Sequence, residues 1–164
     1  MHRQPGAGRH ESKDRRPPVI AIVRHDKMKT YDDIKEYRNS SKALQFADSW
    51  LAAQKAGQVS SDYHMNLLFW TRHDPEVVLA IVLNLIDRVG EDDQTAEMIA
   101  MGPVEWLVEH TDDTFTETLQ AAIADHPGFA LYTKGNRENN TDHSWSRLKM
   151  SAEQTAAASP PFDR

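Results

Sequence analysis

The chain has 164 residues, with 25 aspartates and glutamates against 19 lysines and arginines, and no cysteine. This length is typical of one domain, and the lack of cysteine excludes disulfides, thiolate metal sites and cysteine nucleophiles. The longest apolar run, 77–83, is far shorter than the ~20 residues that span a bilayer, and the N-terminus has no apolar signal region, so a cytoplasmic protein is expected.

Charge is divided unevenly along the chain. Residues 1–29 carry eight Lys or Arg against three acids, so the net −6 of the whole chain becomes +5 for this segment and −11 for the remainder. An acidic body argues against a nucleic-acid-binding face there, because phosphate neutralisation requires clustered Lys and Arg. It favours a basic protein partner, although acidity also serves simply to keep a domain in solution.

The two ends of the chain differ in composition from its middle. Residues 1–18 combine prolines and glycines with charges and lack bulky apolar side chains, which predicts a disordered basic tail. A second disordered tail is predicted over 151–164, so the folded domain is expected over 19–150. Residues 19–24 form a β-branched run after two prolines, which predicts one short strand without an identifiable partner.

Helix patterns follow. Ser40 or Ser41 is placed to cap a helix that Gly57 ends. The apolar residues of this helix share one face at three- and four-residue spacing: Leu44, Ala47, Trp50 and Leu51. A shorter helix is predicted over 63–71, with Leu67, Leu68 and Trp70 as its apolar content.

The central helix is predicted from a strong start signal. Asp74 can accept hydrogen bonds from the N–H groups that a first helical turn leaves free, and Pro75 fits that first turn. From Val77 to Val89 the pattern is apolar nearly all round, which is typical of a helix covered on several sides. Gly90 is expected to end it.

The stretch EMIAMGPVEWLVEH, residues 97–110, places a Gly-Pro break inside apolar sequence. Gly102 can close one helix in the left-handed conformation, and Pro103 can open the next. Glu105 is then placed to cap the second helix through the backbone N–H of the cap residue, which we favour over a catalytic acid. The pattern predicts a tight helix–helix corner that turns four side chains toward one core: Met98, Met101, Trp106 and Leu107.

The C-terminal part of the domain repeats the capping pattern. Thr114 with Glu117 predicts a capping box, followed by an apolar stripe of Phe115, Leu119, Ala122 and Ile123. This helix is expected to end at Asp125-His126. A turn at Pro127-Gly128, a polar loop over 134–144 and a last short helix over 145–150 complete the prediction. Together the patterns predict an all-α bundle of about six helices joined by tight corners.

Residues 46–131 resemble a bacterial all-helical family known as domain of unknown function sixty-eight sixty-nine. The matching pieces are FADSWLAAQ, LLFW, DPEVVLAIVLNLI, AMGPVEWLVEH and AAIADHPGFALY. The corner Gly102-Pro103-x-Glu105-x-Leu107 is the most specific of them. The resemblance implies a compact all-α domain, and it brings no catalytic residues.

Residues 22–40 are also similar to the opening of plasmid mobilisation relaxases, which begin with a strand followed by Arg and Lys-x-Lys. Those enzymes then present a His-Asn-x-Arg stretch used in DNA nicking. Here the corresponding residues 37–40 read Tyr-Arg-Asn-Ser, without the histidine. The chain is also too short for that enzyme fold, so the likeness implies no nicking activity.

Candidate chemistry is sparse. The eight histidines contain no pair at the i, i+4 spacing of a helical metal site, and His73, His110 and His126 fall at predicted helix C-termini, where imidazole suits the dipole. The aspartate clusters 91–93 and 112–113 precede helices, so capping explains them better than metal binding. Trp50, Trp70 and Trp106 lie on apolar faces, whereas Trp145 follows a polar loop and is the candidate partner contact.

These patterns favour a non-enzymatic protein-binding or regulatory module without a cofactor, of which an immunity-type inhibitor is one concrete form. Two alternatives stay open. The first is a metal-assisted hydrolase whose carboxylates at 91–93 or 112–113 converge with a histidine. The second is an accessory factor of a mobile element that contacts DNA through its basic N-terminal tail.

Overall fold

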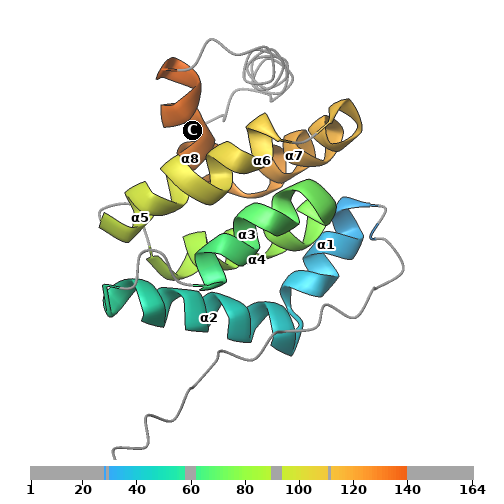
Figure 1. Cartoon of the computed structure of the whole chain (residues 1–164). Coiled ribbons are helices and arrows are strands. Elements are labelled where there is room, and N and C mark those ends of the chain that lie inside the picture. The colour runs from blue at the N-terminus through green and yellow to red at the C-terminus, as the bar shows by residue number, and fades with distance from the viewer. Residues whose placement is uncertain (1–27, 29, 58–61, 90–93, 111, 140–164) are drawn as a thin grey trace, which may run out of the picture.

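The computed structural model describes residues 28, 30–57, 62–89, 94–110 and 112–139, and every regular element in these ranges is helical (Figure 1). In chain order the elements are α1 (Tyr31–Arg38), α2 (Ser41–Lys55), α3 (Asp62–His73), α4 (Pro75–Val89), α5 (Gln94–Ile99), the π-helix η1 (Ala100–Val104), α6 (Glu105–Glu109), α7 (Asp113–Asp125) and α8 (Pro127–Asn139). The predicted all-α fold is confirmed. None of the described helices has the length and apolar character needed to cross a membrane.

Four predictions fall outside these ranges. They are the tails 1–18 and 151–164, the strand 19–24 and the last helix with Trp145. With them lie the helix end predicted at Gly90 and the aspartate cluster 91–93.

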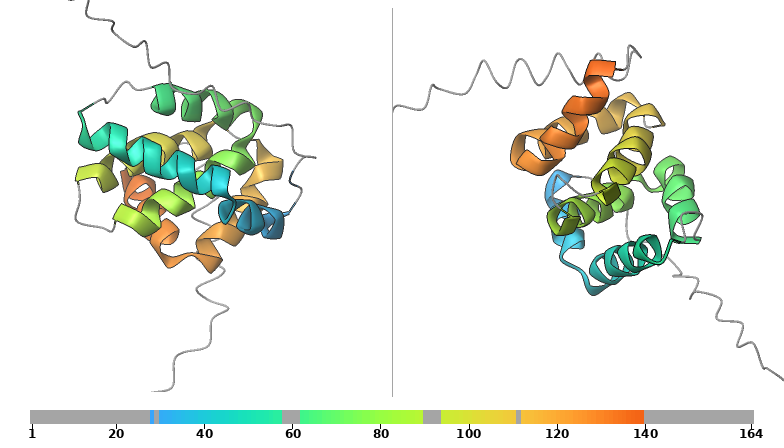
Figure 2. Two further views of the ribbon diagram at one scale, coloured as in Figure 1. Left: turned by 90° about the horizontal axis from the view of Figure 1, so that it is seen from below. Right: turned by 90° about the vertical axis from the view of Figure 1, so that its left-hand side faces the viewer.

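Helix α4 is the centre of the molecule, as its apolar sequence predicts. All ten residues from Val77 to Ile86 are buried. In the right-hand view of Figure 2, α4 lies in the middle, with α2 below it, α3 on the right, α1 on the left and the C-terminal helices above. A helix that is apolar on every side requires neighbours on every side, and these helices supply them.

The N-terminal helices begin at side-chain caps. Thr30 and Asp33 form a capping box at the start of α1, in which Thr30 Oγ1 accepts from the Asp33 N–H and Asp33 accepts from the Thr30 N–H. Sequence analysis missed α1, because Ile34 is its only buried residue and one apolar position shows no period. At α2, Ser40 Oγ accepts from the N–H of Ala43, as predicted.

Two predicted helix boundaries, the end of α2 at Gly57 and the start of α4 at Pro75, are found in the structure. Gly57 follows α2 in a left-handed conformation, with φ of 73°, which confirms its predicted role. Helix α4 begins at Pro75, also as predicted. The N–H groups of Val77 and Val78 donate to the backbone carbonyl of Asp74, at 3.0 and 3.4 Å.

The predicted corner at Gly102-Pro103 is wrong. Residues 94–109 form one continuous helix that widens into the π-helix η1 around Pro103. Gly102 is not in the left-handed conformation, since Gly57 is the only glycine with positive φ in the described ranges. Proline has no backbone N–H to donate within a regular helix, and its ring clashes with the carbonyl of the residue four positions earlier. A widened π turn accommodates both properties.

The predicted cap at Glu105 is wrong for the same reason. Because the helix continues through Pro103, no new helix with unbonded N–H groups begins at Glu105. The backbone N–H of Glu105 itself donates to the carbonyl of Gly102. The side chains predicted to face the core differ in burial. Leu107 is fully buried, Trp106 is partly buried, and Met101 is 63 % exposed.

The predicted Thr114–Glu117 capping box is wrong, because helix α7 begins two positions earlier than that box implies. Asp112 is the cap, and its Oδ1 accepts from the N–H groups of Thr114 and Phe115 at 3.1 and 3.2 Å. A hydrogen bond from the Thr114 hydroxyl, followed by the Phe115 N–H, lowers the pKa of Asp112. Asp and Thr are both good caps, and here Asp112 is favoured because one of its oxygens serves three donors.

Helices α7 and α8 are joined at His126 without the predicted turn. Helix α7 ends at Asp125, as predicted, but Pro127 is already the first residue of α8, a position that suits proline. Gly128 is required there, because a Cβ would lie 2.8 Å from Cγ2 of Ile86 in α4. Helix α8 continues to Asn139, so residues 134–139 are helical and this part of the polar loop predicted over 134–144 is wrong.

Candidate functional site

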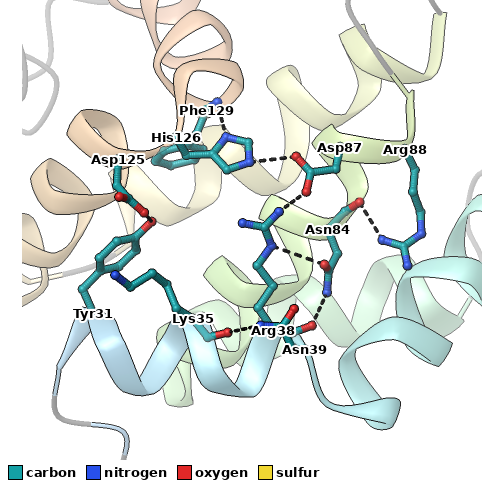
Figure 3. Close-up of polar contacts among 10 residues, drawn as sticks. All are labelled: Tyr31, Lys35, Arg38, Asn39, Asn84, Asp87, Arg88, Asp125, His126 and Phe129. Carbon is teal, nitrogen blue, oxygen red and sulfur yellow. Dashed lines mark hydrogen bonds and ion pairs between the residues drawn. The ribbon is translucent and has the colours of Figure 1, made fainter.

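Polar side chains from α1, α4 and the start of α8 form one connected set (Figure 3), which we call the polar network: Arg38, Asn84, Asp87 and His126. Asn84 is buried, and its amide group donates to the carbonyl of Arg38 at 2.8 Å while its oxygen faces Arg38 Nε at 3.4 Å. Both ends of a buried amide are therefore satisfied by one residue of α1.

Asp87 joins the network to α8. One carboxylate oxygen pairs with the guanidinium of Arg38, and the other lies 2.8 Å from Nε2 of His126. The Nδ1 atom of His126 accepts from the N–H of Phe129 at 3.0 Å. Because Nδ1 accepts, the proton of a neutral imidazole lies on Nε2 and is donated to Asp87.

This geometry excludes His126 as the base of an Asp–His pair. A general base needs a free nitrogen within reach of a substrate proton, and Nδ1 is occupied as the cap of α8. Burial, followed by the charge of Arg38, lowers the pKa of His126 and so favours the neutral ring that this capping role requires. The polar network holds α1 and α8 against α4.

The metal-assisted alternative gains no support from the described residues. They contain no group of three His, Asp or Glu side chains that could hold a metal ion. Asp112 is committed to capping α7, and the cluster 91–93 lies outside the described residues. His73 and His110 lie at the ends of α3 and α6, as predicted.

A different feature is found on the other side of α4. Three of the four large apolar side chains that are exposed in the described ranges come from α3 and η1: Met65 at 55 %, Phe69 at 61 % and Met101 at 63 %. We call these three residues the α3–η1 face. The fourth, Leu131, belongs to α8.

The contact between the two helices brings these side chains to one side. Helix α3 and the continuous helix α5–η1–α6 run side by side in the same direction (Figure 1). Their contact is marked by His64, whose ring centroid lies 4.9 Å from that of Trp106. A Cβ on Gly102 would lie 3.7 Å from the same imidazole.

Helix geometry then fixes the direction of the exposed residues. Met65 follows His64 by one position, and Met101 precedes Gly102 by one. In two parallel right-handed helices, one residue forward from the contact on one helix and one residue backward on the other rotate toward the same side of the contact. That side faces solvent, because Met65 and Met101 are both more than half exposed.

Carboxylates border the α3–η1 face along α5 and α6. Glu97, Met101, Glu105 and Glu109 follow at four-residue intervals, and the wide π turn between them keeps this spacing close to one line. Burial, followed by the negative charge of Glu109, raises the pKa of Glu105. Glu97 and Glu105 form no ion pair with any described Lys or Arg.

The sequence analysis did not find this site. Met101 was predicted to face the core, and the helix predicted over 63–71 has more apolar residues than one buried face can hold. The signal was present: residues 65–70 of α3 contain five apolar side chains in six positions. Of these, Leu67 and Trp70 are buried while Met65 and Phe69 are not. The predicted contact Trp145 lies outside the described residues.

Comparison of the chain with protein-family models, with curated proteins and with solved structures finds no match. The resemblance of residues 46–131 to a helical family therefore stays a prediction. The site is interpreted from its own geometry.

Proposed function

We propose that this chain is a non-enzymatic protein-binding module and that the α3–η1 face is its binding surface. One observation carries the proposal: Met65, Phe69 and Met101 are each more than half exposed, and helix geometry places them on the same side of two adjacent helices. Single exposed apolar residues are ordinary, whereas a contiguous group is typical of an interaction surface. Methionine and phenylalanine suit this role, because both are enriched in interface cores.

The remaining features agree with a binding role. The one Asp–His pair among the described residues is used to join helices. An immunity-type inhibitor is one concrete form, in which the module covers the working surface of a partner. The lack of cysteine suits a cytoplasmic location for this module.

The lack of cysteine also allows a sharp experiment, since one introduced thiol is the only thiol in the chain. Met101→Cys places a maleimide-benzophenone crosslinker on the α3–η1 face, and Glu117→Cys places it on the exposed surface of α7. Crosslinking in native lysate followed by mass spectrometry should give an adduct with the first variant that the second lacks.

A third variant tests whether the apolar surface is responsible. Phe69→Asp added to Met101→Cys should remove the adduct, because a carboxylate would have to be desolvated in the interface. Equal adducts at positions 101 and 117, or adducts unaffected by Phe69→Asp, would contradict the proposal. Circular dichroism of each variant checks that the helices are intact.

A further inference from the structure

The charge around the α3–η1 face indicates the chemistry of its partner. We propose that the occupant is an amphipathic helix of a partner protein, with apolar side chains on one stripe and Lys or Arg along the edge that meets Glu97, Glu105 and Glu109. This inference rests on the proposed function of the face. It adds the partner's secondary structure and its charge.

The spacing of the three apolar side chains suits contact with a partner helix. Met65 and Phe69 are one turn apart on α3, and Met101 lies on the neighbouring parallel helix. A partner helix laid along these two helices would contact all three side chains with residues at i, i+3, i+4 and i+7. It would pack as a further helix of the bundle, in the same way as the bundle's own helices pack on one another.

The acidic border sets the sign of the partner's charge. Glu97, Glu105 and Glu109 lie along one edge of the face, and no described Lys or Arg is paired with Glu97 or Glu105. Burial, followed by the negative charge of Glu109, raises the pKa of Glu105, so both make its charged form less favourable than in water. A cation from a partner would relieve that repulsion, whereas an acidic or phosphate-bearing partner would increase it.

The test uses three synthetic peptides of equal length with the same leucine stripe. Their polar positions are Lys, Gln or Glu. Affinity for the full chain is measured by fluorescence anisotropy at low and at moderate salt. The Lys peptide should bind most tightly, and moderate salt should reduce its advantage over the Gln peptide because exposed ion pairs are screened.

Two double variants separate the site from the general acidity of the protein. Glu105→Gln with Glu109→Gln should weaken binding of the Lys peptide about threefold to tenfold, the effect of losing two exposed ion pairs. The matched control, Glu36→Gln with Glu117→Gln, removes the same charge from α1 and α7 and should leave affinity unchanged. Glu105→Lys with Glu109→Lys should reverse the preference, so that the Glu peptide binds best.

Each other outcome overturns the inference. Equal binding of the Lys and Gln peptides would leave an apolar binding face and remove the charge argument, so the proposed function would stand without this partner. Equal weakening by both Gln double variants would mean attraction by the whole acidic surface. Crosslinks from position 101 to a second copy, or to residues 1–29 of the same chain, would identify a different occupant.

Discussion

Helix α1, which carries part of the polar network, and helix α3, which carries part of the α3–η1 face, lie on opposite sides of α4 (Figure 2). The two regions differ in whether their polar and apolar groups have partners. In the polar network each polar side chain has a partner: Arg38 and the imidazole of His126 share Asp87, and the amide of buried Asn84 is bonded at both ends. On the α3–η1 face, apolar side chains are open to solvent, and no described Lys or Arg forms an ion pair with the bordering Glu105. The bonded groups of the polar network hold helices together, whereas the exposed apolar side chains and the carboxylate of Glu105 beside them are open to a binding partner.

The largest expected difference between the two regions concerns aromatic residues. Phe129 follows His126 and is fully buried, whereas Phe69 is 61 % exposed. Phe129→Ala should lower the free energy of unfolding by about 3–5 kcal/mol, and Phe69→Ala should change it by less than about 0.5 kcal/mol. Urea denaturation followed by circular dichroism measures both. A large loss with Phe69→Ala would mean that this ring packs on the bundle and is not available to a partner.

Glycines sharpen the comparison. Gly128→Ala should cost about 1–3 kcal/mol, because the new methyl group would overlap Ile86 of α4. Gly102→Ala should instead stabilise the protein by about 0.4–1 kcal/mol, since this glycine has a helical conformation and the methyl group finds ordinary contacts at 3.7 Å. Thermal unfolding of the two variants checks the signs. Destabilisation by Gly102→Ala would indicate a left-handed corner in place of the continuous helix.

Replacing a carboxylate by its amide should change the free energy of unfolding in opposite directions in the two regions. Asp87→Asn leaves the guanidinium of Arg38 without its ion pair and should cost about 1–2 kcal/mol, between the values for exposed and buried charged contacts. Glu105→Gln removes a like-charge contact with Glu109 one turn away and should stabilise by about 0.2–0.5 kcal/mol at pH 7. A loss of stability with Glu105→Gln would restore a structural role for its carboxylate.

Acid should weaken the polar network through His126. Its folded pKa lies below the ordinary 6.5, so the unfolded chain binds a proton first as the pH falls. This contribution to stability is complete above about pH 6.5 and is lost as the pH falls below that value toward the lower folded pKa. Protonation would also remove the acceptor that caps Phe129.

The check is a pair of histidine variants. His126→Asn keeps a capping oxygen without titrating, so unfolding free energy should depend less on pH between 7 and 5 than in the original chain. Burial also lowers the pKa of His64 beside Trp106, so His64→Gln should remove a second, separate part of the dependence. An unchanged pH dependence in both variants would contradict this account.

Much of the fold was predictable because local signals and tertiary structure agree. The run 77–86 is apolar at every position except Asn84, and the start signals at Ser40 and Pro75 act within one helical turn. The Gly-Pro break at 102–103 was misread, because the same two residues suit a corner or a π turn. Only the packing of His64 and Trp106 around them distinguishes the two.

The candidate site was less accessible to sequence analysis. Exposure of Met65 and Phe69 depends on how much of α3 the rest of the bundle can cover, and that is a property of the packed molecule. Asp87 gave no signal either, because its partners Arg38 and His126 are distant in sequence and meet it only through the arrangement of α1 and α8.

The central position of α4 has a consequence for synthesis on the ribosome. Helices α1 to α3 precede α4 and cover only part of its surface, while α5, α6 and α8 cover the rest. Roughly fifty residues separate the end of α4 from the end of α8, and at about 5–20 residues per second their synthesis takes several seconds. During that interval, part of a helix whose residues 77–86 are all buried in the folded protein is uncovered on the nascent chain. This helix is therefore the segment that we expect a nascent-chain chaperone to bind.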